Sequence, residues 1–120
     1  MTIEQCYELL GGSYAAVLER LMKKERVEKF LLRISADPSF EQLQKAFESQ
    51  DWQNAFAAAH TLKGISANMG FSDLNEAAGR LTESLRHGVT ESSAEYYAQT
   101  DAAWQKVLQV IDLYRRENGL

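Results

Sequence analysis

Apolar residues recur along this chain at intervals of three and four positions, the spacing expected for amphipathic helices. Glycines, an Asp–Pro pair and residues that favour helix starts interrupt this pattern and set the helix boundaries. No stretch shows the apolar–polar alternation of a strand. Six helical runs are predicted: from Thr2 to Leu10, from Tyr14 to about Ala36, from Ser39 to about Glu48, from Trp52 to Met69, from Ser72 to a stop at Gly88, and from about Ser92 to Glu117.

Capping residues support several of these boundaries. Thr2 and Gln5 have the spacing of a capping box. Ser13, Asp51 and Ser72 are predicted N-caps of the runs that follow them. Short connections between amphipathic helices favour antiparallel neighbours, so the chain is predicted to form an all-α bundle. We see no repeat or linker, and the whole of residues 1–120 is interpreted as a single domain.

The run over residues 52–69 carries His60 on the face opposite its apolar residues. With successive residues about 100° apart, the apolar stripe lies at about 140–220° from His60. We therefore expect His60 to project into solvent. The stripe consists of Ala55, Ala58, Leu62, Ile65 and Met69.

The outer face around His60 is small or apolar, whereas the solvent face of a bundle helix usually carries Glu, Lys and Gln. Gly64 costs about 1 kcal/mol relative to alanine in a helix interior. We interpret it as clearing space around the imidazole, and the alternative is a glycine that permits a close helix crossing. The residues within roughly 60° of His60 are Gln53, Phe56, Ala57, Lys63, Gly64 and Ala67.

Lys63 lies one helical turn from His60, which places the bases of the two side chains about 5–6 Å apart. A cation at this position disfavours imidazolium and so favours a neutral, nucleophilic ring near about pH 7. It also attracts a phosphoryl group once one is attached. The alternative is an ordinary solvated lysine.

Composition narrows the classes of function. The net charge of −4 argues against a general nucleic-acid binder. The chain shows neither a signal peptide nor the run of about 20 apolar residues of a membrane helix, so we expect a cytoplasmic protein with no membrane partner. The lone Cys6 excludes an internal disulfide. His60 and His87 have no carboxylate or thiol at ligand spacing, so no metal site is predicted, and His87 is interpreted as favoured by a helix C-terminus.

The segment His60–Gly70, HTLKGISANMG, resembles the active-helix motif of histidine-containing phosphotransfer (HPt) domains. That family motif is His-x-Leu-Lys-Gly followed by a glycine that ends the helix. The Asp51–Trp52 helix start fits the same pattern, as do Leu74, Leu81 and Leu85 in the next helix. The resemblance covers essentially the whole chain, and it implies an antiparallel four-helix bundle with additional short helices.

The resemblance also implies a function for the motif. His60 would accept a phosphoryl group from the phospho-aspartate of a receiver domain and pass it to another receiver. Lys63 would stabilise the phosphate, and Gly64 would give the partner access. Leu62 would belong to the core, and Gly70 would stop the helix.

Further residues are predicted around the histidine. Family members often place a polar residue of the next helix near it, and Arg80 and Ser84 are the candidates here, although the sequence does not say whether their flank faces His60. Phe56 could instead pack under the short helix over residues 39–48. The apolar docking surface predicted around His60 comprises Phe56, Ala57, Ala67 and Phe71.

The sequence lacks other parts of a phosphoryl-transfer centre. No acid lies near His60 on its own helix, and there is no glycine-rich phosphate loop for a nucleotide. The domain is therefore interpreted as a carrier in a bacterial-type phosphorelay and not as an enzyme, with no cofactor and with the metal supplied by its partner. Partners implied are response-regulator receiver domains, with a hybrid histidine kinase as a further candidate, and we expect a monomer.

A second class of function remains open from the sequence. A helical adaptor could keep the bundle and dock a signalling partner without being phosphorylated. His60 and Lys63 together favour the carrier, because a simple binding module has no need for both.

Overall fold

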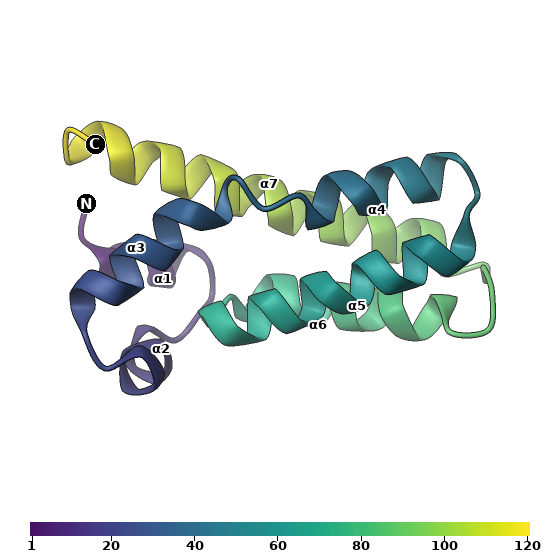
Figure 1. Cartoon of the computed structure of the whole chain (residues 1–120), viewed down its shortest axis with the longest axis horizontal. Coiled ribbons are helices and arrows are strands. Elements are labelled where there is room, and N and C mark those ends of the chain that lie inside the picture. Colours follow the sequence, from purple (N-terminus) through teal and green to yellow (C-terminus); the bar gives the residue numbers. More distant parts are fainter.

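The computed structural model describes residues 1–120 and contains seven helices and no strand (Figure 1). Most expected boundaries agree with it to within one or two residues. The helices are α1 (Ile3–Leu9), α2 (Tyr14–Leu21), α3 (Lys24–Ile34), α4 (Ser39–Glu48), α5 (Trp52–Met69), α6 (Ser72–Leu85) and α7 (Ser93–Glu117).

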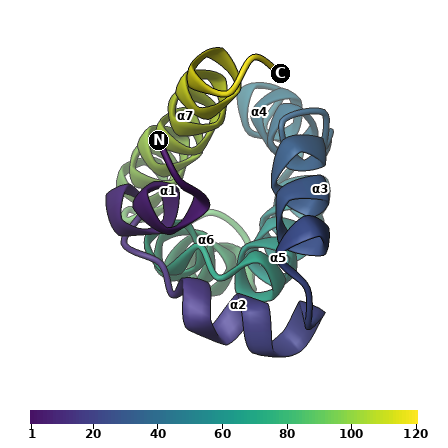
Figure 2. The same cartoon turned by 90° about the vertical axis from the view of Figure 1, so that its left-hand side faces the viewer.

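The helices form an antiparallel bundle with four columns. α3 and α4 follow one another along one column, and α5, α6 and α7 form the other three (Figure 1). The end view in Figure 2 shows these columns arranged around a common axis, with α1 and α2 at one end. The expected four-helix bundle with additional short helices is therefore confirmed.

The core extends along the whole bundle and receives residues from all seven helices. Burying one large apolar side chain completely stabilises a fold by roughly 1.5–3 kcal/mol. Aromatic rings join α4 to α7, because Phe40 stacks on Trp104 with 6.1 Å between the ring centroids. Among the largest fully buried side chains are Tyr7, Leu31, Leu43, Leu62, Phe71, Leu81 and Ile111.

The single helix expected over residues 14–36 is wrong, because the chain breaks at Met22. Met22 has a φ of 71°, in the left-handed region, and its N–H donates to the carbonyl of Leu18. Lys23 then has an extended backbone and precedes the first residue of α3. The polar stretch that begins there is exposed, as expected for a solvated connection.

The break lets α2 and α3 make different contacts. Arg20 on α2 donates to the carbonyls of Ala67 and Asn68, at the end of α5. α3 instead runs beside α7, where Tyr114 donates its hydroxyl hydrogen to Glu28. The break at Met22 therefore separates a helix that contacts the end of α5 from one that contacts α7.

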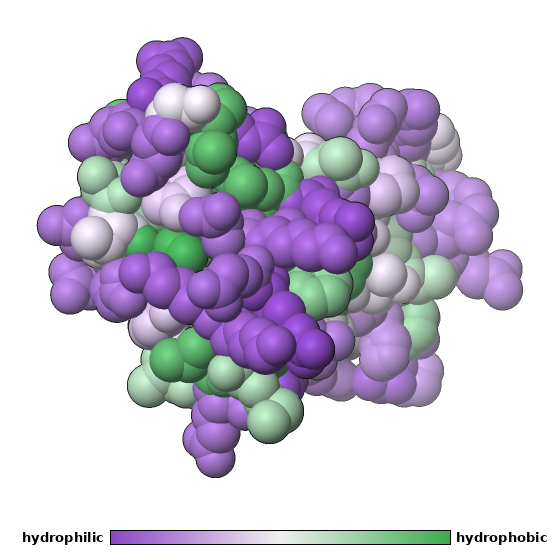
Figure 3. All heavy atoms as spheres, turned by 60° about the vertical axis from the view of Figure 1, so that its left-hand side comes forward, coloured by the Kyte–Doolittle hydropathy of each residue, from purple (hydrophilic) through white to green (hydrophobic).

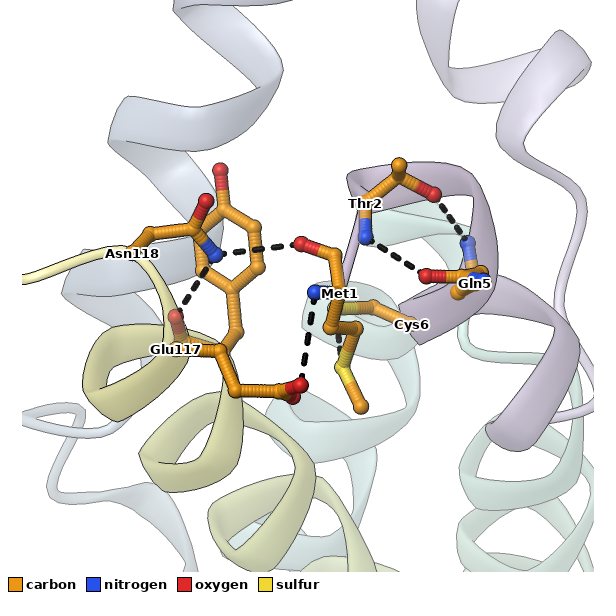
Figure 4. Close-up of polar contacts among 7 residues, drawn as sticks. Met1, Thr2, Gln5, Cys6, Glu117 and Asn118 are labelled. Atoms are coloured by element: carbon orange, nitrogen blue, oxygen red, sulfur yellow. Dashed lines mark hydrogen bonds and ion pairs between the residues drawn. The ribbon is translucent and has the colours of Figure 1, made fainter.

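The two ends of the chain lie close together (Figure 4). Asn118 donates its amide to the carbonyl of Met1 at 3.0 Å, and the terminal ammonium lies 3.5 Å from Glu117. The capping box predicted for α1 is present, with Thr2 and Gln5 exchanging hydrogen bonds. These contacts fix α1 against the end of α7.

The end of the molecule that carries α1 to α3 is largely hydrophilic (Figure 3). Apolar residues appear there in separate groups rather than as one continuous area. Leu9, Met22 and Phe30 are the exposed large apolar residues of these three helices and their connections.

Candidate functional site: the outer face of α5

Local sequence signals define both ends of α5. The Asp51 carboxylate accepts the N–H of Asn54 at 3.3 Å, which satisfies one of the free donors at the helix start. Gly70 ends the helix in the left-handed conformation, with a φ of 71°. The expected cap and the expected stop are both confirmed, so the position of each residue around the helix axis is set.

The two faces of α5 differ as the sequence predicts. Ala55, Ala58, Leu62 and Met69 are buried, and Ile65 is half-buried. His60 is exposed on the opposite side. Its exposed neighbours on this face are Gln53, Ala57, Lys63, Gly64 and Ala67.

Gly64 faces open space. A Cβ atom built on Gly64 meets no heavy atom within 4 Å outside its own helix backbone. No neighbouring helix therefore needs the glycine for a close crossing, and that alternative has no support in the packing. The missing side chain instead leaves free space one turn beyond His60.

Lys63 lies against α6. A Cβ atom at Gly79 would be 3.6 Å from the Cε of Lys63, so the aliphatic part of the lysine runs past this glycine. The amide of Asn75 donates to the backbone carbonyl of Lys63 at 2.9 Å, which holds the two helices in register at this level. Lys63 as a whole is exposed, one helical turn from His60.

A hollow of about 640 Å³ opens between α5, α6 and the start of α7, and Lys63 forms part of its wall. Arg80 and Ser84 line the same hollow, so their flank of α6 does face the motif lysine. Arg80 forms an ion pair with Glu76, and the Ser84 hydroxyl donates to the carbonyl of Leu81 at 2.8 Å. No hydrogen bond joins either residue to His60.

Phe56 belongs to an aromatic and cationic group on the His60 face. Its ring is parallel to the imidazole of His60, with an interplanar angle of 2° and 6.3 Å between centroids. The guanidinium carbon of Arg86 lies 5.4 Å from the centroid of Phe56. Phe56 is half-buried, and these two side chains are its aromatic and cationic neighbours.

Phe56 packs against the edge of the core, but the aromatic residues of α4 form their ring pairs with other side chains. Phe47 packs edge-on against Trp52 and stacks on Tyr97 of α7, with centroids 5.2 and 4.3 Å apart. Phe40 also stacks on Tyr97. The aromatic residues of α4 therefore make their contacts with α7 and with the start of α5.

Sequence reasoning missed a second charged pair beside the histidine. Arg86 donates from Nε and Nη2 to the two carboxylate oxygens of Glu83, at 3.1 and 2.7 Å. The hydrogen bonds from Arg86 lower the pKa of the Glu83 carboxyl, and the charges of Lys63 and of His60 in its protonated form lower it further. Glu83 thus lies within electrostatic range of His60, although no acid does so on α5 itself.

The prediction that Phe71 lies on the docking surface is wrong. Phe71 is 1% exposed, and its ring lies 5.9 Å from that of Tyr7 in α1. Helical angles do not extend past Gly70, where the chain turns inward. The predicted N-cap Ser72 is instead the first residue of α6. Phe71 occupies the N-cap position, and no side chain caps this helix.

No group of three or more His, Cys, Asp or Glu side chains is placed to hold a metal ion. None of the seven helices combines the length and the apolar composition needed to cross a membrane.

Comparison with known proteins agrees with this arrangement. The family model of the Hpt domain matches residues 29–112 of the 120, a span that contains the whole of α5 and α6. No curated protein and no solved structure matches the chain.

Proposed function

The chain belongs to the Hpt domain family, whose members are histidine phosphocarriers of phosphorelays, and on this premise we propose that His60 is its phosphoryl acceptor. His60 would take the phosphoryl group from a receiver-domain phospho-aspartate and pass it to a second receiver. The observation that carries the proposal is the exposed imidazole on α5, opposite the buried stripe that contains Leu62. Of the two histidines in the chain, only His60 lies within the family motif.

The proposed transfer balances without a proton being lost. The unprotonated nitrogen of the neutral imidazole attacks phosphorus, and the bond between phosphorus and the aspartyl oxygen breaks. The aspartate leaves as a carboxylate, and the ring retains its N–H and becomes a phosphorylated imidazolium. In the return step a receiver carboxylate attacks the same phosphorus, and the ring leaves as neutral imidazole.

The neighbours of His60 support separate parts of this reaction. The ammonium group of the exposed Lys63 can neutralise charge on the phosphoryl oxygens. The open space at Gly64 admits the rim of a receiver active site. Ala57, Ala67 and the half-buried ring of Phe56 offer the partner a partly apolar surface.

In this proposal the partner activates the phosphorus atom. A receiver would supply the aspartyl group and the metal ion, while this chain supplies the nucleophile and Lys63. The chain would therefore act as a carrier and not as an enzyme. A response regulator, and a hybrid histidine kinase with its own receiver domain, would be the matching partners, and one copy of the chain contains every residue that the proposal uses.

Incubation with a phosphorylated receiver domain tests the proposal. We expect phosphate that is labile in acid and stable in base to appear on the wild-type chain and on His87→Gln, and to be absent from His60→Gln. His87→Gln is the matched control, since it removes the other exposed histidine. Label on His87 or on a serine would contradict the assignment.

The same experiment separates the carrier from the helical adaptor. An adaptor would bind the receiver, and His60→Gln would bind it equally well, but no phosphoryl group would appear on either chain. Binding measured by calorimetry beside the label therefore distinguishes docking alone from docking with transfer.

A further inference from the structure

The ion pair between Glu83 and Arg86 is connected to His60 through Phe56. Arg86 spans the Glu83 carboxylate and the face of Phe56, and Phe56 lies parallel to the imidazole. α5 and α6 are antiparallel, and Lys63 lies beside Gly79. Because the two helices run in opposite directions, Glu83 on α6 lies at the level of His60 on α5, and Arg86 lies at the level of Phe56.

We propose that Glu83 binds Arg86 while His60 is unphosphorylated. When His60 is phosphorylated, Arg86 exchanges this carboxylate for the phosphoryl group. The proposal rests on the proposed function of His60. It assigns Arg86 as a phosphate-binding residue and Glu83 as the residue that positions it in the unloaded chain.

Charge and geometry favour this exchange. The planar guanidinium fork that binds two carboxylate oxygens fits two phosphoryl oxygens equally well. A phosphoryl group carries about two negative charges, and these repel the carboxylate of Glu83 while attracting Arg86. Lys63 and Arg86 would then contact the phosphoryl group from opposite sides of His60 along α5.

The ion pair between Arg86 and Glu83 can separate at little cost in free energy. The side chains of Arg86 and Glu83 are 48% and 61% exposed, and exposed pairs of this kind contribute little to stability. After the exchange Glu83 remains in water, so no charge is left buried. The remaining contact of Arg86, with the face of Phe56, keeps the guanidinium beside the ring that lies parallel to the imidazole.

The test uses the chain alone, with phosphoramidate as the phosphoryl donor. The P–N bond of phosphoramidate breaks, ammonia leaves, and a bond between the ring nitrogen and phosphorus forms. Loading is followed by ³¹P NMR, and the Nε–H resonances of Arg86 and Arg116 are recorded before and after it. Arg116 is the internal control, because it forms a similar exposed pair with Asp112 on α7.

We expect the Arg86 resonance to move on loading and the Arg116 resonance to stay in place. Glu83→Gln should load about threefold faster, because it removes repulsion and frees Arg86, and Arg86→Gln should load about threefold slower. Asp112→Asn makes the same change in net charge far from His60, and it should load like the wild type.

Each other outcome has a distinct meaning. If the wild type loads but the Arg86 resonance does not move, or if Glu83→Gln loads at the rate of Asp112→Asn, the exchange is refuted while His60 remains the acceptor. If the wild type takes up no phosphoryl group from phosphoramidate and none from a phosphorylated receiver domain, the proposed function is overturned, and the exchange is overturned with it.

Discussion

The two faces of α5 are built from the same small residues but in opposite surroundings. On the inner face Ala55 is fully buried, and it allows the neighbouring helices to approach. On the outer face Ala57 and Gly64 are exposed, and the space beside Gly64 is empty. Small side chains on one face thus serve packing within the chain, while on the other they leave room for another molecule.

This contrast indicates that stability and transfer can be changed separately. A change on the inner face should alter the free energy of unfolding and leave the chemistry of His60 intact wherever the chain is folded. A change on the outer face should alter phosphoryl transfer and should change the free energy of unfolding much less. The four predictions that follow test this separation from both sides.

The largest effect is expected at His60. His60→Gln should abolish acceptance of the phosphoryl group completely, while the melting temperature should stay within about 2 °C, because an exposed side chain contributes little to stability. Radiolabel transfer and thermal denaturation measure the two properties. A strongly destabilised variant would mean that the imidazole has a packing role.

On the inner face, Leu62→Ala should lower the free energy of unfolding by about 2–5 kcal/mol, since it empties a fully buried site. Urea denaturation measures this loss. At low temperature, where the variant is still folded, the transfer rate should remain close to that of the wild type. A rate that falls tenfold in the folded variant would show that the two faces are coupled.

Phe56 lies between the two faces, since it is half-buried. Phe56→Ala should weaken receiver binding by about 1 kcal/mol or more if the ring contacts the partner. Its effect on the free energy of unfolding should also be near about 1 kcal/mol, below the cost of truncating a fully buried aromatic ring. A loss of several kcal/mol in urea denaturation would assign Phe56 to the core.

The smallest effect is expected at Gly64. Gly64→Ala should raise the free energy of unfolding by up to about 1 kcal/mol, because alanine favours the helix and the new methyl group meets no neighbour. It should slow transfer from the receiver a few-fold, which quench-flow measurements can detect. Unchanged transfer would show that the partner does not approach this position.

The sequence was sufficient for α5 because local signals agree there. Asp51 and Gly70 mark its two ends, and the apolar spacing between them assigns each residue to a face. The burial of Leu74, Ala78, Leu81 and Leu85 on α6 follows from spacing in the same way. In both helices the periodicity is uninterrupted, so the angle of one residue predicts the angles of the others.

The remaining features depend on contacts between distant segments. Met22 carries no local signal for a left-handed backbone, and the break there separates α2, whose Arg20 reaches the end of α5, from α3. The pairing of Glu83 with Arg86 could have been suspected from their spacing, because residues three apart lie on one helix face. Their position beside His60 requires the register between α5 and α6.

Gly70 meets two requirements at once, and the second one comes from outside the family span. Asparagine often replaces glycine at a left-handed helix end, but a Cβ atom at Gly70 would lie only 2.3 Å from the Cγ2 of the buried Val17. Gly12, five residues before Val17, also lies against Gly70, because a Cβ atom added at Gly12 would lie 2.1 Å from the Gly70 carbonyl oxygen. Both neighbours precede residue 29, where the family match begins. The N-terminal helices therefore restrict which amino acids this motif position can evolve to accept, and a relative that lacks them could carry asparagine where this chain cannot.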